Sequence, residues 1–240
     1  MSYNTKILTD GCENLGITLS DTQIEQFMIY YEYLIEKNKV MNLTGITEFE
    51  DVMIKHFVDS LAVVKAVDMS RINTLLDLGT GAGFPGIPLK IAFPHVEMVL
   101  LDSLNKRINF LKELIEKCRL EKITAIHGRA EEYAKQKEYR ESFDLCVSRA
   151  VANLSSLSEY CIPYVKLNGQ FISYKSGNID IEIKEAENAV KILGGRNENI
   201  IKFTLPKSDI ERSFVIIEKV KETPAKYPRK AGLPTKDPLK

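Results

Sequence analysis

The feature that most constrains this chain is the glycine-rich stretch Asp77-Leu78-Gly79-Thr80-Gly81-Ala82-Gly83-Phe84-Pro85-Gly86. Four of its last eight residues are glycines, and it lies between the apolar pair Leu75-Leu76 and a helix-like run at residues 87–91. Because glycine tolerates tight turns and leaves the main chain bare to a ligand, this pattern predicts a strand that breaks sharply into a helix. We expect the turn to bind a ligand.

The residue that opens the stretch, Asp77, favours one class of ligand. A carboxylate beside the glycines would repel the pyrophosphate of NAD, whereas S-adenosylmethionine offers an ammonium and a sulfonium. A nucleoside triphosphate is disfavoured, because its binding loop ends in Gly-Lys-Ser/Thr and here Ile87 and Pro88 follow Gly86. Taken alone, the motif is also compatible with a plain tight turn in another α/β protein.

Short apolar runs and helical patterns alternate from residue 73 onward. Strand-like runs cover residues 75–78, 96–101, 123–127, 145–148, 171–174, 200–205 and 214–220, and helix-like ones cover 87–93, 106–119, 154–165 and 179–193. This alternation predicts an α/β fold with a mostly parallel seven-stranded sheet and helices on both faces. Only residues 206–213 separate the last two strands, too few for a helical crossover, so we expect that pair to be antiparallel.

We expect three regions along the chain. Residues 1–70 form an N-terminal helical cap, with Ser20 and Gln23 as a capping box for a helix that ends near residue 38, and with Thr47 and Glu50 repeating the pattern before a second helix. Residues 71–222 form the α/β domain. Residues 223–240 form a basic, Pro-rich C-terminal tail that is extended and lies on the surface.

Composition limits the class of protein. No apolar run approaches the ~20 residues that span a bilayer, and the N-terminus lacks a secretory pattern, so we expect a cytoplasmic protein with no membrane partner. The four cysteines form no close pair, which indicates neither a disulfide framework nor a zinc site, and no metal is expected. Nothing demands more than a monomer.

The charges balance over the whole chain but not along it. There are 33 basic and 33 acidic residues, yet residues 219–240 carry seven Lys/Arg against two Asp/Glu. This basic end is a candidate phosphate-binding surface. The alternative is a solvated, partly disordered end.

Candidate binding residues follow successive strands, at the edge where open α/β sheets bind ligands. Asp102 ends the second strand, where a carboxylate can accept both hydroxyls of a ribose, or else cap the next helix. Glu131, within residues 128–133, can lie at the edge of an adenine ring, or else be a first-turn helix acid. Ser148 and Arg149 end the fourth strand, where Arg149 can meet nucleic acid or a donor carboxylate, or else form a structural salt bridge.

Two polar segments interrupt the N-terminal helices. Asn42 and Thr44 lie in residues 39–45 and can satisfy loop backbone. His56 lies in residues 55–60 and can be a partly buried, hydrogen-bonded histidine. Nothing near it in the sequence supports a catalytic role.

Together these motifs resemble a known family over about residues 30–238. The residues that carry the resemblance are Asn42-Leu43-Thr44, 56–60, 77–86, 128–133, Ser148-Arg149-Ala150 and the tail Tyr227-Pro228-Arg229-Lys230-Ala231-Gly232. They are similar to the bacterial 16S ribosomal RNA guanine-N7 methyltransferases, also called glucose-inhibited division protein B. The Gly-Phe-Pro-Gly and Tyr-Pro-Arg-Lys sequences are more specific than the glycine turn.

The resemblance implies a Rossmann-like class I methyltransferase with S-adenosylmethionine as methyl donor. It implies a guanine in a small-subunit rRNA loop near the decoding region as substrate, and 16S rRNA or the small ribosomal subunit as partner. The donor-binding candidates are Asp77, Gly79, Gly81, Gly83, Phe84, Asp102, Ala130, Glu131 and Arg149. The candidate RNA contacts are Asn42, Ser148, Arg229 and Lys230.

Guanine N7 has a lone pair and no hydrogen, so it can attack the methyl group without a general base. We expect catalysis by positioning, with Arg149 as a positioning residue and with Phe84 and Arg149 as surfaces on which a splayed base could stack. The alternatives are a similar methyltransferase acting on another RNA, a small molecule or a protein, a nicotinamide-dependent oxidoreductase, and a non-catalytic RNA-binding or ribosome-assembly factor.

Overall fold

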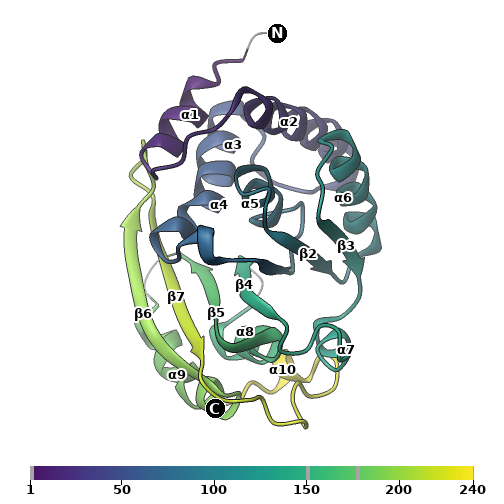
Figure 1. The fold of residues 1–240 in the computed structure, drawn as a ribbon, viewed down its shortest axis with the longest axis vertical. Helices are drawn as coiled ribbons and strands as arrows, with labels where there is room; N and C mark the ends of the chain where they lie inside the picture. Colours follow the sequence, from purple (N-terminus) through teal and green to yellow (C-terminus); the bar gives the residue numbers. More distant parts are fainter. Residues whose placement is uncertain (1–2, 150–151, 177–178, 240) are drawn as a thin grey trace.

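The computed structural model describes residues 3–149, 152–176 and 179–239. Its centre is a seven-stranded sheet with the order β3-β2-β1-β4-β5-β7-β6 (Figure 1). The strands are β1 (Thr74–Leu78), β2 (Glu97–Asp102), β3 (Ile123–His127), β4 (Phe143–Arg149), β5 (Val165–Lys175), β6 (Gly195–Thr204) and β7 (Glu211–Lys219).

Strands β1 to β5 pair in parallel, and β7 runs antiparallel between β5 and β6. The predicted α/β class, the mostly parallel seven-stranded sheet and the antiparallel last pair are confirmed. Because the parallel strands share one direction, the carboxyl ends of β1, β2, β3 and β4 lie at the same edge. The Gly79 amide joins two of them there by donating to the Leu101 carbonyl at 2.8 Å.

Helices cover both faces of the sheet (Figure 1). The α-helices are α1 (Lys6–Glu13), α2 (Asp21–Met41), α3 (Phe49–Val52), α4 (Asp59–Leu61), α5 (Gly86–Ala92), α6 (Asn105–Lys117), α7 (Ala130–Tyr133), α8 (Leu154–Cys161), α9 (Asp180–Ile192) and α10 (Leu233–Lys236). A π-helical turn, η1 (Met53–Val58), joins α3 to α4, and 3₁₀ turns cover η2 (Ala62–Lys65), η3 (Met69–Arg71) and η4 (Ile162–Tyr164).

Of the two helix caps predicted in the N-terminal region, the structure confirms one and contradicts the other. Ser20 Oγ accepts from the Gln23 amide at 3.3 Å, and the Gln23 side chain accepts from the Ser20 amide at 2.8 Å, which completes the capping box of α2. The second predicted cap is wrong: α3 begins after Glu48, and no side chain caps it. Thr47 is instead held by its main chain, whose carbonyl accepts from the Tyr31 hydroxyl at 3.3 Å.

The N-terminal helices share their hydrophobic core with the sheet. Leu8, Phe27 and Phe57 are fully buried in one cluster with Leu75 of β1 and Leu100 of β2. A second cluster covers the other face, between the sheet and helices α8 and α9. Cys12, Cys118, Cys146 and Cys161 are all free and buried. Among the helices of the described ranges, none is both long and apolar enough to cross a membrane.

The C-terminal segment, residues 223–239, lies on the surface as predicted, but it packs against α8 and is not extended throughout. It lies below α8 in Figure 1 and ends in the short helix α10. Ser156 of α8 donates to the Pro234 carbonyl at 2.8 Å, and Ser155 donates to the Leu239 carbonyl. Tyr227 is buried in the second cluster, which explains why a segment of basic and proline residues keeps a defined path.

Candidate functional site

Two carboxylates on neighbouring strands hold the glycine turn in place. Asp77 of β1 accepts from the Gly86 amide at 2.8 Å, at the start of α5. Asp102 of β2 accepts from the amide of Gly81, whose φ of 62° lies in the left-handed region that favours glycine. A Cβ at Gly86 would stand 2.3 Å from Leu100, so only glycine allows this approach of helix and strand.

Asp77 lies beneath the turn. It is fully buried and lines neither of the two cavities at the turn. Burial raises its pKa from 3.8 to about 6, although the Thr80 side chain, the Gly86 amide and the charge of Arg149 partly offset this effect. Its second oxygen and the hydroxyl of Thr80 are both buried, and Thr80 is the nearby side chain that most favours the ionised form of Asp77.

Two cavities meet at this turn. The tail-side cavity, of about 280 Å³, is lined by Leu78, Gly79, Leu101, Asp102, Ser103, Gly128, Arg129, Ala130, Glu131, Ala152, Tyr160, Gly232 and Thr235. The cap-side cavity, of about 370 Å³, is lined by Leu43, Thr44, His56, Gly79, Thr80, Gly81, Ala82, Phe84, Asp102, Ser103, Arg107 and Arg149. Gly79, Asp102 and Ser103 belong to both linings, so the cavities are neighbours across these residues.

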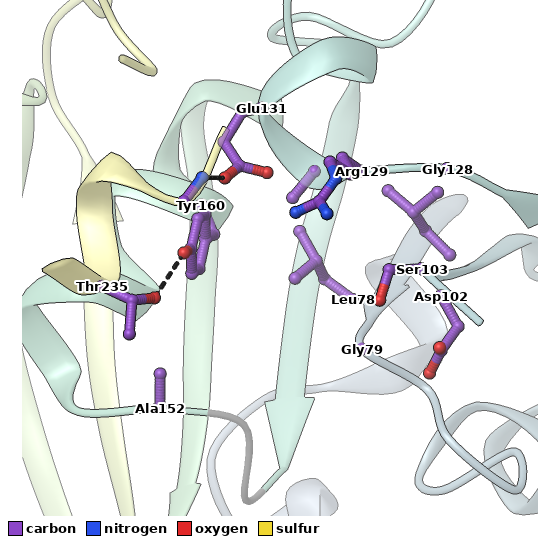
Figure 2. Close-up of a pocket in the computed structure, with 13 residues that line it drawn as sticks. Leu78, Gly79, Asp102, Ser103, Gly128, Arg129, Glu131, Ala152, Tyr160 and Thr235 are labelled. Atoms are coloured by element: carbon purple, nitrogen blue, oxygen red, sulfur yellow. Dashed lines mark hydrogen bonds between the residues drawn. The ribbon is translucent and has the colours of Figure 1, made fainter. Parts of the chain in front are cut away.

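The tail-side cavity combines an apolar floor with polar ends (Figure 2). Leu78, Ala130 and Ala152 supply carbon surface. The buried Glu131 accepts from the Gly232 amide at 2.7 Å with one oxygen, and Figure 2 shows its other oxygen directed into the cavity. Apolar walls with a few fixed polar groups are typical of sites that bind small molecules and cofactors.

Asp102 stands between the two cavities and accepts hydrogen bonds at both of its carboxylate oxygens. One oxygen accepts from the Leu104 amide at 2.9 Å, just before α6. The other accepts from the Gly81 amide at 2.9 Å and from Arg107 at 3.3 Å. The carboxylate therefore stabilises the start of α6 and the glycine turn while it lines both cavities.

Arg149, at the end of β4, reaches the cap-side cavity as part of an ion-pair network. Its guanidinium donates to Asp59 at 3.0 Å, and Asp59 also accepts from Arg212 of β7 at 2.9 Å. The guanidinium carbon lies 4.9 Å from the centre of the Phe84 ring. Arg149 therefore forms a structural ion pair, which was one of its two predicted roles. It also lines the cap-side cavity.

His56, which sequence reasoning set aside, completes the cap-side cavity. Its Nδ1 lies 3.3 Å from Arg149 Nη2, and its Nε2 lies 2.7 Å from the Thr44 hydroxyl. A guanidinium can only donate, so Nδ1 accepts and the proton is on Nε2, which donates to Thr44. Burial, with the nearby charge of Arg149, lowers the pKa of His56 to about 3, so the ring is neutral at pH 7.

Phe84 lies inside an aromatic stack. Its ring centre is 4.3 Å from that of His56 and 5.2 Å from that of Tyr30, and the side chain is almost fully buried. Phe84 thus lines the cavity but offers no open face for a splayed base. The contacts among Thr44, His56 and Phe84 join three separate segments of the chain. In the sequence, the only sign of these contacts was that all three residues lie in motifs similar to those of the methyltransferase family.

Two predicted RNA contacts need correction. Ser148 is fully buried and donates to the Leu78 carbonyl at 2.8 Å, so it joins β4 to β1 and is out of reach of a substrate. Arg229 donates to both oxygens of Glu159, which is itself fully buried. Its guanidinium therefore has a structural partner and is not a free cation for phosphate.

The other predicted residues are placed as follows. Asn42 is exposed and ends α2 in a left-handed conformation, outside both cavity linings. Lys230 is exposed, and Gly83 is a buried residue of the turn with a φ of 102°. Ala150, part of the motif after β4, lies outside the described residues.

The fold is that of the class I S-adenosylmethionine-dependent methyltransferases. Among solved structures, the chain is similar to StiE O-MT residues 961–1257, with a TM-score of 0.55 and 14% identity over 70% of this chain and 75% of that one. It is also similar to M. jannaschii TYW2 in complex with AdoMet, with a TM-score of 0.50 and 13% identity over 63% of this chain and 73% of that one. At such identities the likeness concerns the fold alone.

Sequence comparison identifies the family. Residues 23–213 match the model described as GidB, rRNA small subunit methyltransferase G. The chain is 56% identical over 229 residues to the ribosomal RNA small subunit methyltransferase G of Lachnoclostridium phytofermentans, covering 95% of both chains. It is 47% identical over 236 residues to the protein of that name from Bacillus subtilis, covering 98% of this chain and 99% of that one. The chain belongs to the rRNA small subunit methyltransferase G family.

Proposed function

We propose that this protein transfers a methyl group from S-adenosylmethionine to N7 of a guanine in 16S ribosomal RNA. The observation that carries the proposal is the pair of cavities that meet at the glycine turn. A donor with an adenosyl half and an amino-acid half fits two neighbouring compartments. The names of the relatives support ribosomal RNA as the substrate, and an rRNA substrate implies a cytoplasmic enzyme, which we expect to act as a monomer.

The tail-side cavity suits the adenosyl half. Asp102 offers carboxylate oxygens to the ribose hydroxyls, and the Glu131 oxygen that faces the cavity can accept the exocyclic amine of adenine. The apolar side chains between them match the faces of the ring. The turn glycines leave the main chain close to the donor.

The cap-side cavity suits the methionine half. Arg149 lines it and can bind the donor carboxylate through a charge-assisted hydrogen bond. Thr80 also lines it, and its hydroxyl oxygen can accept from the donor ammonium. The Asp77 carboxyl beneath the turn adds a favourable field for a cation whenever it is ionised.

The chemistry needs no proton transfer. The N7 lone pair forms the new bond to the methyl carbon, the carbon–sulfur bond breaks, and its electron pair stays on sulfur, so the positive charge moves from sulfur to the guanine ring. His56 fits this mechanism as a spectator, because it is neutral and its Nδ1 lone pair already accepts from Arg149. Rate acceleration then comes from holding N7 and the methyl group in line.

The test is methylation with labelled donor of naked 16S rRNA and of small subunits, with the modified nucleotide identified by mass spectrometry. In Arg149→Ala we expect kcat/KM to fall about 100-fold, since misplacing a donor by an ångström costs that much. Asp59 keeps Arg212 as a partner, so the variant should fold. The matched control is Arg196→Ala, which removes an arginine that is 66% exposed on β6 and paired with Glu218.

Three outcomes would contradict the proposal. Label at another guanine atom would remove the N7 assignment. Label in proteins or small molecules but not in rRNA would favour another substrate class. Normal turnover by Arg149→Ala would remove this arginine from the site.

A further inference from the structure

The C-terminal segment, residues 223–239, supplies one wall of the tail-side cavity. Gly232 and Thr235 belong to the lining, opposite Gly79 and Asp102 of the glycine-turn side. The Thr235 hydroxyl lies 2.6 Å from that of Tyr160 on α8, and this contact is visible in Figure 2. Without the segment the cavity would be open on this side.

Buried polar anchors hold the segment in place. Arg229 donates from Nε to both oxygens of Glu159 at 2.9 and 3.0 Å, and from Nη2 to one of them at 2.7 Å. Glu159 is fully buried, so leaving its carboxylate unpaired would be costly. Arg140 donates to the main-chain carbonyls of Thr223 at 2.7 Å and Tyr227 at 3.0 Å. These bonds fix the path of the segment on both sides of Tyr227.

Glu131 connects this segment to the inside of the cavity. One of its oxygens accepts from the Gly232 amide at 2.7 Å, and the other is directed into the cavity (Figure 2). A carboxylate held through one oxygen has its second oxygen oriented as well. Docking of the segment therefore sets the direction of the acceptor that faces the ligand.

We propose that docking of the C-terminal segment and binding of the adenosyl half of the donor are coupled through Glu131, with Arg229 as a positioning residue. The inference rests on the proposed function, because it takes the tail-side cavity as the donor site. Such coupling is reciprocal. If docking of the segment raises the affinity for the donor by some factor, then donor binding raises the equilibrium constant for docking by the same factor. The tail thereby belongs to the donor site and is more than a basic surface for RNA.

Hydrogen exchange of the Gly232 amide in the wild-type protein tests the coupling directly. This amide exchanges when the segment opens locally. If S-adenosylhomocysteine binds only the docked form, the open fraction falls by 1 + [L]/Kd, so exchange should slow about 100-fold at 100 times Kd. Amides of β6, at the far edge of the sheet, should show no such slowing.

Variants test the role of Arg229. In Arg229→Gln we expect faster exchange at Gly232 and a Kd for S-adenosylhomocysteine about tenfold higher, within the range usual for coupled sites. Arg229→Lys should recover part of both effects because it keeps the charge next to Glu159. Lys236→Gln is the control, since this exposed lysine of α10 makes no ion pair within the described residues.

The outcomes separate this inference from the proposed function. If S-adenosylhomocysteine binds the wild-type protein but leaves exchange at Gly232 unchanged, the coupling is refuted while the donor site stands. An Arg229→Gln variant with fast exchange and an unchanged Kd would refute it too. If S-adenosylhomocysteine does not bind at all, the proposed donor site itself fails. The wild-type measurement decides the matter even if a variant does not fold.

Discussion

Replacing Asp77 by asparagine should change how stability depends on pH. The carboxyl is fully buried and accepts from the Gly86 amide at 2.8 Å, a bond that an asparagine oxygen can keep. Burial raises the pKa of Asp77 in the folded protein from 3.8 to about 6. The folded state therefore binds this proton more tightly than the unfolded state. The stability that results is present below about pH 4 and is lost as pH rises to about 6.

The size of the effect follows from the two pKa values. Ionising Asp77 in the fold costs roughly 3 kcal/mol by pH 8, of which about 1.4 kcal/mol is lost between pH 5 and pH 8. Asp77→Asn does not titrate and escapes this loss. Relative to the wild type, its free energy of unfolding should therefore rise by about 1.4 kcal/mol over this interval.

Urea denaturation of both proteins at pH 5 and pH 8 measures the difference. His56 titrates in the opposite sense, because its folded pKa is lowered to about 3, but it is present in both proteins and cancels. A difference that stays constant, or that falls as pH rises, would show that Asp77 is ionised in the fold throughout this range. The pKa of Asp77 in the folded protein would then not be raised.

The same carboxyl gives a test of donor binding. A cationic donor bound above the turn lowers the pKa of Asp77, so binding near pH 6 should release up to about half a proton. Calorimetry in buffers of different ionisation enthalpy measures this release. Asp77→Asn should bind the donor without releasing a proton. Equal proton release by both proteins would assign the proton to another group.

Three further predictions concern the residues around the cavities. Because the pKa of His56 is lowered to about 3, His56 should contribute no step near pH 6.5 to the profile of kcat/KM, and any step near pH 6 should disappear in Asp77→Asn; a step that disappears in His56→Gln would contradict this. Ser148→Ala should lower the free energy of unfolding by about 1 kcal/mol through loss of its bond to Leu78, with RNA affinity unchanged in a binding titration. Lys230→Gln should reduce the salt slope of RNA binding by about 1 if this exposed lysine contacts a phosphate; an unchanged slope would remove it from the RNA surface.

The order of strands and helices along the chain could be predicted from local sequence. The glycine turn after Asp77 marks where β1 ends and α5 begins, and the alternation of apolar runs indicates the other strands and the longer helices of the α/β region. These features depend on residues close together in the chain, where spacing and the backbone preferences of glycine act directly. For the same reason the capping box at Ser20 was predictable.

Only the tertiary structure decided which side chains meet. Ser148 and Arg149 are adjacent, yet strand geometry turns them to opposite faces, so that one is buried against β1 and the other reaches the cap-side cavity. The pairing of Arg229 with Glu159 and the stacking of His56 on Phe84 join segments far apart in the chain. The type of a residue determines what its side chain can bind. Which partner it meets depends on how the whole sheet and its helices pack, and a local sequence pattern does not carry that information.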